Sequence, residues 1–397
     1  MTGFVTVSSV PFCKKEDNMK KRILAMVMAL SVAAMLQGCG QSGDAQAEAP
    51  AAEAESTEAE STEAESAEAE SAEAEAPAEE GQTDSKSEYK VGIVQYVDDA
   101  SLNQIEANIE KELDAKGEEL GVSFDYADYT FNGQADSTVI NQIATQLVED
   151  QVDIIIPIAT PTAMVMQSAT ADNQIPVVFS AVTDPVAAGL VASLDAPGAN
   201  ITGTSDALDT KAVLDIMMAV NPQVKKLGLL YDKGQDSSAA AIEEAKSYAQ
   251  EKGIEIVEKT GTTNDEISLA ADALIAEQVD AAFTPTDNTV MTAELGIFEK
   301  FQEAKIPQYC GADSFALNGA FLGYGVNYAD LGTLTADLAV DILVNGKTPA
   351  DTPVATLDNG IATINTETAE IIGADYSMVA DMCTGLVEVT TAENFDN

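Results

Sequence analysis

Five short polar segments, each placed between an apolar run and a helix-like segment, carry most of the chemistry available to this chain. They span residues 95–99, 160–162, 180–185, 286–289 and 313–314. Ligands of open α/β sheets bind beyond the carboxyl ends of the strands. Each segment taken alone is also explained by helix capping, which favours Ser, Thr, Asp and Asn. Their occurrence at five strand ends favours a single binding cleft.

Hydroxyl groups in these segments could hold a carboxylate, because hydroxyls and helix N-terminal amides bind anions without any arginine. The candidates are Thr160, Thr162, Ser180 and Thr183. Pro161 and Pro185 suit the first helical position, which makes Thr160 and Asp184 caps as well as ligand-binding candidates.

Acidic groups in the same segments could accept an ammonium group, which needs an anionic partner in a desolvated cleft. Asp287 is the first candidate and Asp313 the second, with Asn288 as a neutral partner and Ser314 beside them. Tyr96 could cover an apolar or aromatic ligand side chain, or it could simply pack at a strand end.

Three absences narrow the chemistry further. The chain has no His, which excludes imidazole triads and His-ligated metals, and it has no Trp. Its only arginine is Arg22, near the N-terminus, so a guanidinium clamp in a cleft is excluded. Glycine-rich nucleotide motifs and nucleophile elbows are also missing. We therefore expect a binding protein with no cofactor or metal, although an exported enzyme using only carboxylates remains an alternative.

Apolar runs and helix-like segments alternate from residue 89 onward. Expected strands span residues 91–97, 123–130, 153–159, 176–182, 201–204, 226–231, 255–260, 281–285, 307–311 and 320–326. Expected helices span residues 102–116, 137–149, 162–171, 210–219, 237–252, 266–278, 289–304 and 330–344. This alternation predicts an α/β fold with two doubly wound parallel-sheet lobes. Lobe 1 is expected over residues 89–203 plus about 326–348, and lobe 2 over residues 204–325 plus about 349–397.

The start of the chain resembles a bacterial lipoprotein signal. A cationic segment from Met19 precedes an apolar run of about 14 residues, which is too short to span a membrane. The sequence Leu-Gln-Gly-Cys at residues 36–39 resembles a lipobox, and this resemblance implies lipidation of Cys39 after removal of residues 19–38. An ordinary signal with an incidental cysteine is the alternative. Residues 1–18 are expected to be a misassigned upstream extension.

An acidic, low-complexity segment follows Cys39. Residues 40–88 contain 16 acidic side chains and one basic side chain in Glu-Ser-Ala-type units, which predicts an extended stalk over residues 39–88.

The whole chain has a formal net charge of −48, so no basic surface for nucleic acid is expected. Beyond Cys39 only Cys310 and Cys383 remain, and either a disulfide or two free thiols would fit.

Several of these segments together resemble the ABC transporter substrate-binding proteins of the tryptophan/tyrosine type. The resemblance rests on Val-Gly-Ile-Val-Gln-Tyr-Val (91–97), Ala-Thr-Pro-Thr-Ala (159–163), Ser-Ala-Val-Thr-Asp-Pro-Val (180–186), Asn-Ile-Thr-Gly-Thr-Ser-Asp (200–206) and Pro-Thr-Asp-Asn-Thr (285–289). It implies a type I periplasmic-binding-protein fold with a three-segment hinge. Lobe 1 would supply Tyr96, Thr160, Ser180 and Thr183, and lobe 2 would supply Asp287, Asn288 and Asp313.

The function implied by the resemblance is binding of an aromatic amino acid and its delivery to an ABC permease with its ATPase. The expected protein is an extracytoplasmic monomer held at the membrane through Cys39. A sensor or receptor ectodomain on the same fold, binding another small solute, is the leading alternative.

Overall fold

The computed structural model describes residues 86–395. The expected upstream extension, signal segment, lipidated Cys39 and almost all of the acidic stalk lie outside these residues. All of the described residues belong to one compact unit. Within the described range, none of the helices combines the length and the apolar character needed to cross a membrane.

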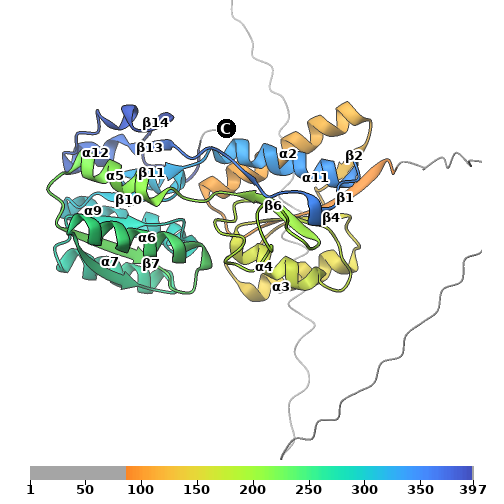
Figure 1. Ribbon diagram of the computed structural model, residues 1–397, viewed down its shortest axis with the longest axis horizontal. Coiled ribbons are helices and arrows are strands. Elements are labelled where there is room, and N and C mark those ends of the chain that lie inside the picture. Colours follow the sequence, from red (N-terminus) through yellow and green to blue (C-terminus); the bar gives the residue numbers. More distant parts are fainter. Residues whose placement is uncertain (1–85, 396–397) are drawn as a thin grey trace, which may run out of the picture. The chain divides into compact units, whose positions relative to one another are not determined.

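The first lobe is built on a parallel sheet with the order β12-β6-β5-β4-β1-β2, and β3 also pairs with β1 (Figure 1). Its strands are β1 (Glu88–Gln95), β2 (Ser123–Asp125), β3 (Thr130–Asn132), β4 (Ile154–Ile158), β5 (Val177–Phe179), β6 (Ile201–Ser205) and β12 (Ala355–Thr356). Its helices are α2 (Ala100–Leu120), α3 (Ser137–Glu149), α4 (Thr160–Thr170) and α11 (Tyr328–Leu343).

Helices cover both faces of this first sheet, with α2 and α11 on one face and α3 and α4 on the other (Figure 1). Successive strand residues point to opposite faces, so both must be apolar. Ile93 and Ile156 pack toward α2 and α11, whereas Val94 and Ile155 pack toward α3 and α4. This two-sided burial explains the continuous apolar runs in the sequence.

The second lobe is built on a sheet with the order β14-β13-β11-β10-β9-β7-β8. Its strands are β7 (Lys226–Tyr231), β8 (Glu255–Thr260), β9 (Ala281–Thr284), β10 (Gln308–Cys310), β11 (Leu322–Gly325), β13 (Ile361–Asn365) and β14 (Gly385–Val389). Its helices are α5 (Thr210–Val220), α6 (Asp236–Lys252), α7 (Asn264–Ala276), α8 (Asn288–Ala293), α9 (Phe298–Ala304), α10 (Asp313–Leu317) and α12 (Thr366–Ile372). Three short 3-10 helices complete the described chain: η1 (Glu294–Gly296), η2 (Pro349–Asp351) and η3 (Val379–Asp381).

The second sheet is parallel except for the pairing of β13 with β11. Strand β11 ends at the side that faces the first lobe, and α11 and β12 then belong to the first lobe. The chain therefore returns to the second sheet at the edge where strands β7 to β11 end. Strand β13 must then run in the opposite direction to them. The predicted two-lobed α/β class is confirmed, with this one antiparallel pairing added.

The last part of the first lobe extends further along the chain than expected. Residues 349–356 were assigned to lobe 2, but η2 contacts β6, and β12 pairs with β6. The amide of Val354 also donates to the carbonyl of Leu194 at 2.8 Å. The three connections between the sheets therefore follow β6, β11 and β12. The two cysteines described, Cys310 and Cys383, are free thiols.

Candidate ligand-binding cleft

A small cavity lies where the carboxyl ends of strands from both sheets meet. Its lining residues are Ser101, Leu102, Ala159, Thr160, Ala181, Thr183, Asp206, Ser237, Thr286, Asn288, Met291 and Tyr328. The volume is about 10 Å³, which is room for roughly one water molecule. Both lobes contribute walls, so a larger ligand fits only when the lobes close around it at a wider spacing.

Two alanines in the wall have strained backbone conformations. Ala159 follows β4 with φ 78° and ψ 152°, and Ala181 follows β5 with φ 54°. Residues other than glycine rarely adopt a positive φ, and those that do cluster at binding sites. The turn at Ala159 starts α4 directly at the cavity, with Thr160 as its first residue. The amino end of an 11-residue helix therefore opens onto the cavity.

Asp206 places a buried carboxylate in the cavity wall. One of its oxygens accepts a hydrogen bond from the Thr183 hydroxyl at 3.0 Å, and the other accepts one from Tyr328 at 3.4 Å. Burial raises the pKa of Asp206 to about 6. Both hydrogen-bonding partners are neutral, so a cationic group in the cavity would gain an uncompensated anion as its neighbour.

Two hydroxyls in the wall have unused hydrogen-bonding capacity. Thr160 Oγ1 and Ser237 Oγ are buried and have no hydrogen-bond partner among the described residues. Leaving such groups unpaired costs on the order of 1–3 kcal/mol each. A polar ligand group in the cavity would recover that cost.

Asp313 joins the two lobes directly. Ser101 at the start of α2 donates to one oxygen of Asp313 at 2.5 Å, and Gln104 donates to the other at 3.0 Å. The nearby Asp99 caps α2, and burial together with the charge of Asp313 raises its pKa to about 6. Burial also raises the pKa of Asp313. The contact between the lobes therefore brings these two acidic groups close together.

Asp287 is placed behind the cavity wall. It caps α8, with one oxygen accepting from the amides of Thr289 and Val290. The other oxygen accepts from the Asp232 amide at 2.8 Å and the Ser238 hydroxyl at 2.6 Å. Four donors from its own lobe therefore satisfy this fully buried carboxylate. Its predicted contact with an ammonium group is the role that this geometry supports least.

Two further predicted residues, Asn288 and Tyr96, both lie close to Gln235 of the second lobe. Asn288 lines the cavity and donates to the side chain of Gln235 at 3.1 Å. Tyr96, from the first lobe, lies close to Gln235 and Asp232, and burial raises the pKa of its phenol. It is not among the cavity-lining residues, so its contact with a ligand stays a prediction.

Four other predicted residues lie next to the cavity without lining it. Ser180 shares a 2.8 Å hydrogen bond with Thr335 of α11, and Asp184 caps the following turn through the amide of Ala187. Thr162 and Ser314 are fully buried, and the Thr162 hydroxyl has no hydrogen-bond partner in the described part of the chain. Thr160, Thr183 and Asn288 are thus the predicted residues found directly in the cavity wall.

Several lining residues were not anticipated from sequence, above all Asp206, Tyr328 and Ser237. Asp206 follows β6, so the rule of polar groups at strand ends would have found it. Tyr328 is the first residue of α11 and Ser237 the second residue of α6, positions where the sequence pattern indicates only a helix start. Among the described residues, no cluster of three or more His, Cys, Asp or Glu side chains could hold a metal ion.

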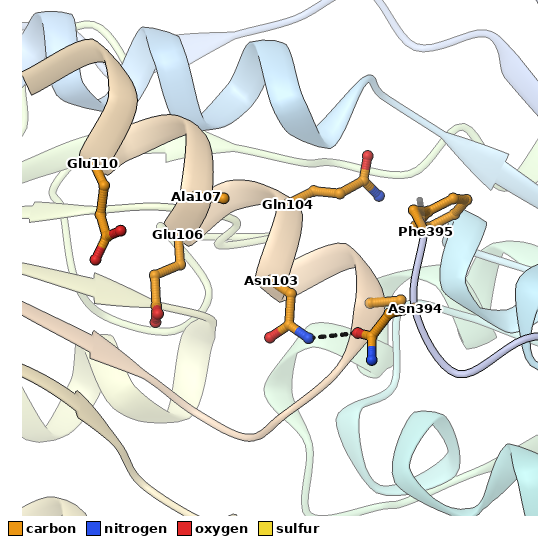
Figure 2. A pocket seen from close by; sticks show the side chains of 8 residues that line it. Asn103, Gln104, Glu106, Ala107, Glu110, Asn394 and Phe395 are labelled. Carbon is orange, nitrogen blue, oxygen red and sulfur yellow. Dashed lines mark hydrogen bonds between the residues drawn. The ribbon is translucent and has the colours of Figure 1, made fainter. Parts of the chain in front are cut away.

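A larger hollow of about 410 Å³ lies elsewhere, along α2 (Figure 2). Figure 2 shows Asn103, Glu106 and Glu110 on α2, with Asn394 and Phe395 of the C-terminal segment at one end. Burial, followed by the charges of Glu110 and Asp98, raises the pKa of Glu106 to about 7. This acidic hollow lies outside the strand ends, so it is separate from the cleft.

Known proteins with similar sequences and structures are solute-binding proteins, which agrees with a cleft between two lobes. The model of the ABC transporter substrate binding protein family matches residues 90–378. The chain belongs to this family. Its members are solute-binding proteins, and its architecture is the type I periplasmic-binding-protein fold.

Three relatives of this substrate-binding protein are informative. A "Tyrosine-binding protein" of Clostridioides difficile is 34% identical over 296 residues, covering 74% of this chain and 84% of that protein. The ABC domain from Streptococcus pneumonia in complex with L-Trp is 31% identical, with a TM-score of 0.70, covering 76% of this chain and 100% of that one. A ligand-free, open substrate binding protein with adhesive properties from Clostridium difficile is also 31% identical, with a TM-score of 0.59, covering 77% and 100%. At equal identity, the structure is thus more similar to the ligand-bound relative.

Proposed function

We propose that this protein binds an aromatic amino acid between its lobes and delivers it to an ABC importer, while a lipid on Cys39 anchors it outside the cytoplasmic membrane. The observation that carries the proposal is the pairing of Asp206 with the start of α4 in one cavity. A carboxylate and a helix N-terminus suit the ammonium and carboxylate groups of an amino acid.

The aromatic character of the ligand is supported by the relatives. One is named for tyrosine, and another was solved with L-Trp, each at over 30% identity to this chain. The cavity wall adds apolar surface from Leu102 and Met291 and the ring of Tyr328. Hinge closure over such a ligand would bury its ring and favour the closed conformation.

Binding is tested by calorimetric titration of the purified protein with the twenty amino acids and with common sugars. We expect saturable binding of tyrosine, tryptophan or phenylalanine, and a higher melting temperature in its presence. The protein contains no Trp, so added tryptophan can also be followed by its own fluorescence. Binding of a sugar in place of every amino acid would overturn the proposal.

The anchor is tested by replacing Cys39 with alanine in cells. We expect the unaltered protein in the membrane fraction and the Cys39→Ala protein in the soluble extracytoplasmic fraction. Equal membrane association of both proteins would refute lipid anchoring, and it would leave solute binding to be judged by calorimetry.

A further inference from the structure

A second hollow, of about 290 Å³, opens directly beside the cavity at the β6 and β12 edge of the cleft. It shares Thr183 and Ser237 with the cavity, so the two spaces are adjacent. Its other lining residues are Asp184, Pro185, Val186, Leu194, Ser205, Ala207, Leu208, Thr210, Ala240, Ala241, Glu244 and Thr356. Residues from both lobes form its walls.

The walls of this hollow are mainly apolar. Val186 and Leu194 come from the first lobe and are 45% and 40% exposed, which is unusual for large aliphatic side chains. Leu208 and Ala240 face the same hollow from the second lobe. Exposed apolar surface that borders a binding cavity marks a place where ligand surface can be buried.

Two unsatisfied hydroxyls border the hollow. Thr210, the first residue of α5, is fully buried, and Ser237, in the first turn of α6, is 4% exposed. Neither hydroxyl has a hydrogen-bond partner among the described residues. An apolar hollow with two such groups suits a ring that carries one polar edge.

We propose that this hollow is the side-chain subsite of the ligand, whose amino-acid head occupies the adjacent cavity. The proposal rests on the proposed function, and it names residues that would choose among amino acids. Asp184 and Glu244 at its walls disfavour acidic side chains through like-charge repulsion. The apolar walls and the volume suit an aromatic side chain.

The two hydroxyls would then discriminate among aromatic rings. A phenol can both donate and accept a hydrogen bond, an indole N–H can only donate, and a phenyl ring can do neither. Sites built to bond a ligand hydroxyl reject the analogue that lacks it, because their own polar groups stay unpaired. We therefore expect tyrosine to bind more tightly than phenylalanine.

The subsite is tested first by filling it. Ala240 is exposed on α6 and lines the hollow, whereas its exposed neighbour Ala239 does not. We expect Ala240→Phe to weaken binding of the preferred aromatic amino acid at least tenfold, and Ala239→Phe to leave it within twofold. Both substitutions are at exposed positions, so similar melting temperatures without ligand are expected.

The selectivity is tested by Thr210→Val, which removes the hydroxyl and keeps the side-chain shape. We expect the ratio of tyrosine to phenylalanine affinity to fall about tenfold, because one hydrogen bond is lost. Thr210→Ser should restore the ratio. Unchanged affinities in Ala240→Phe and an unchanged ratio in Thr210→Val would overturn the subsite alone. Failure of the unaltered protein to bind any amino acid would overturn it together with the proposed function.

Discussion

Asp206 and Asp287 are both buried aspartates at strand ends, but their partners differ. Four donors from its own lobe satisfy Asp287, whereas Asp206 faces the cavity with two hydroxyl partners. We expect Asp206→Asn to lower amino-acid affinity at least thirtyfold, because the ligand ammonium would lose its anionic partner in a desolvated site. Calorimetry measures the affinity, and an unchanged melting temperature without ligand would show that the fold is kept.

The matched control for this variant is Asp287→Ala. We expect it to lower the free energy of unfolding by about 1–2 kcal/mol, since a helix cap and buried hydrogen bonds are lost. Urea unfolding measures this change. If Asp287→Ala removed binding without any loss of stability, while Asp206→Asn bound normally, Asp287 would be the ammonium partner after all.

Glu294 makes the stability of the second lobe depend on pH. It is fully buried beside Gln308, and burial raises its pKa to about 8. The folded protein therefore keeps this proton at neutral pH, whereas the unfolded chain releases it above its ordinary value of 4.5. The contribution to stability is full below about pH 4.5 and is lost as pH rises toward 8.

Replacing this acid by its neutral isostere should remove that dependence. We expect Glu294→Gln to raise the free energy of unfolding at pH 7–8 and to flatten its decline between pH 5 and 8. The measurement is urea unfolding at each pH for both proteins. Parallel pH profiles for the two proteins would contradict the assignment.

At the scale of elements, the C-terminal segment after β14 links the two lobes. Ala392 exchanges two hydrogen bonds with the end of α10, through the Leu317 carbonyl and the Asn318 side chain, each at 2.9 Å. Asn103 of α2 then donates to Asn394 at 2.7 Å (Figure 2). The family match ends at residue 378, so this link lies outside it.

Removing the segment should weaken the closed conformation. We expect deletion of residues 390–397 to increase the radius of gyration of the ligand-free protein at pH 4.5 and to lower ligand affinity several-fold. Deletion of residues 396–397 alone is the control, because it keeps Asn394. Small-angle scattering and calorimetry provide the two readouts, and identical values for both deletions would show that the link does not influence closure.

The sequence was most informative where apolar runs and helix caps agree. Strands β7 and β8 and helix α3 have the predicted bounds, because turn residues and caps bracket clear apolar patterns. The predicted helix over residues 289–304 is instead split into α8, η1 and α9. The sequence predicts no strand or helix beyond residue 344, since β12, β13 and β14 depend on the chain returning to each sheet.

The candidate site was less predictable for the same reason. Sequence located Thr160, Thr183 and Asn288 in the cavity wall, because strand ends can be recognised locally. The carboxylate of Asp287 accepts hydrogen bonds from Ser238 and Asp232, which are about 50 residues away in sequence. No sequence pattern relates these residues to Asp287. Such hydrogen bonds between distant residues decide whether an aspartate at a strand end only caps a helix or is free to bind a ligand.

At the scale of the whole molecule, lobe closure concentrates negative charge. Burial, followed by the charges of Asp206, Asp313 and Asp99, raises the pKa of the Tyr328 phenol. Asp99 and Asp206 are buried, and Asp313 is partly buried. Burial raises the pKa of Asp99 and Asp206 to about 6, and it also raises that of Asp313. In separated lobes these groups would be hydrated, with pKa values near the ordinary 3.8.

Closure should therefore bind protons, and rising pH should oppose it. Because the closed form has the higher pKa values, it is favoured at low pH and loses that advantage as pH rises from about 4 through 6. A ligand ammonium among the carboxylates would supply the missing positive charge, so closure at neutral pH would require ligand.

We expect the radius of gyration of the ligand-free protein to increase between pH 4.5 and 7.5, and to stay small at pH 7.5 with saturating ligand. Asp313→Asn removes one charge at the contact with Ser101 and should keep the ligand-free protein compact to higher pH. Asp265→Asn, at an exposed position on α7, is the control. A radius that does not depend on pH, or an equal response of both variants, would show that these carboxylates do not govern closure.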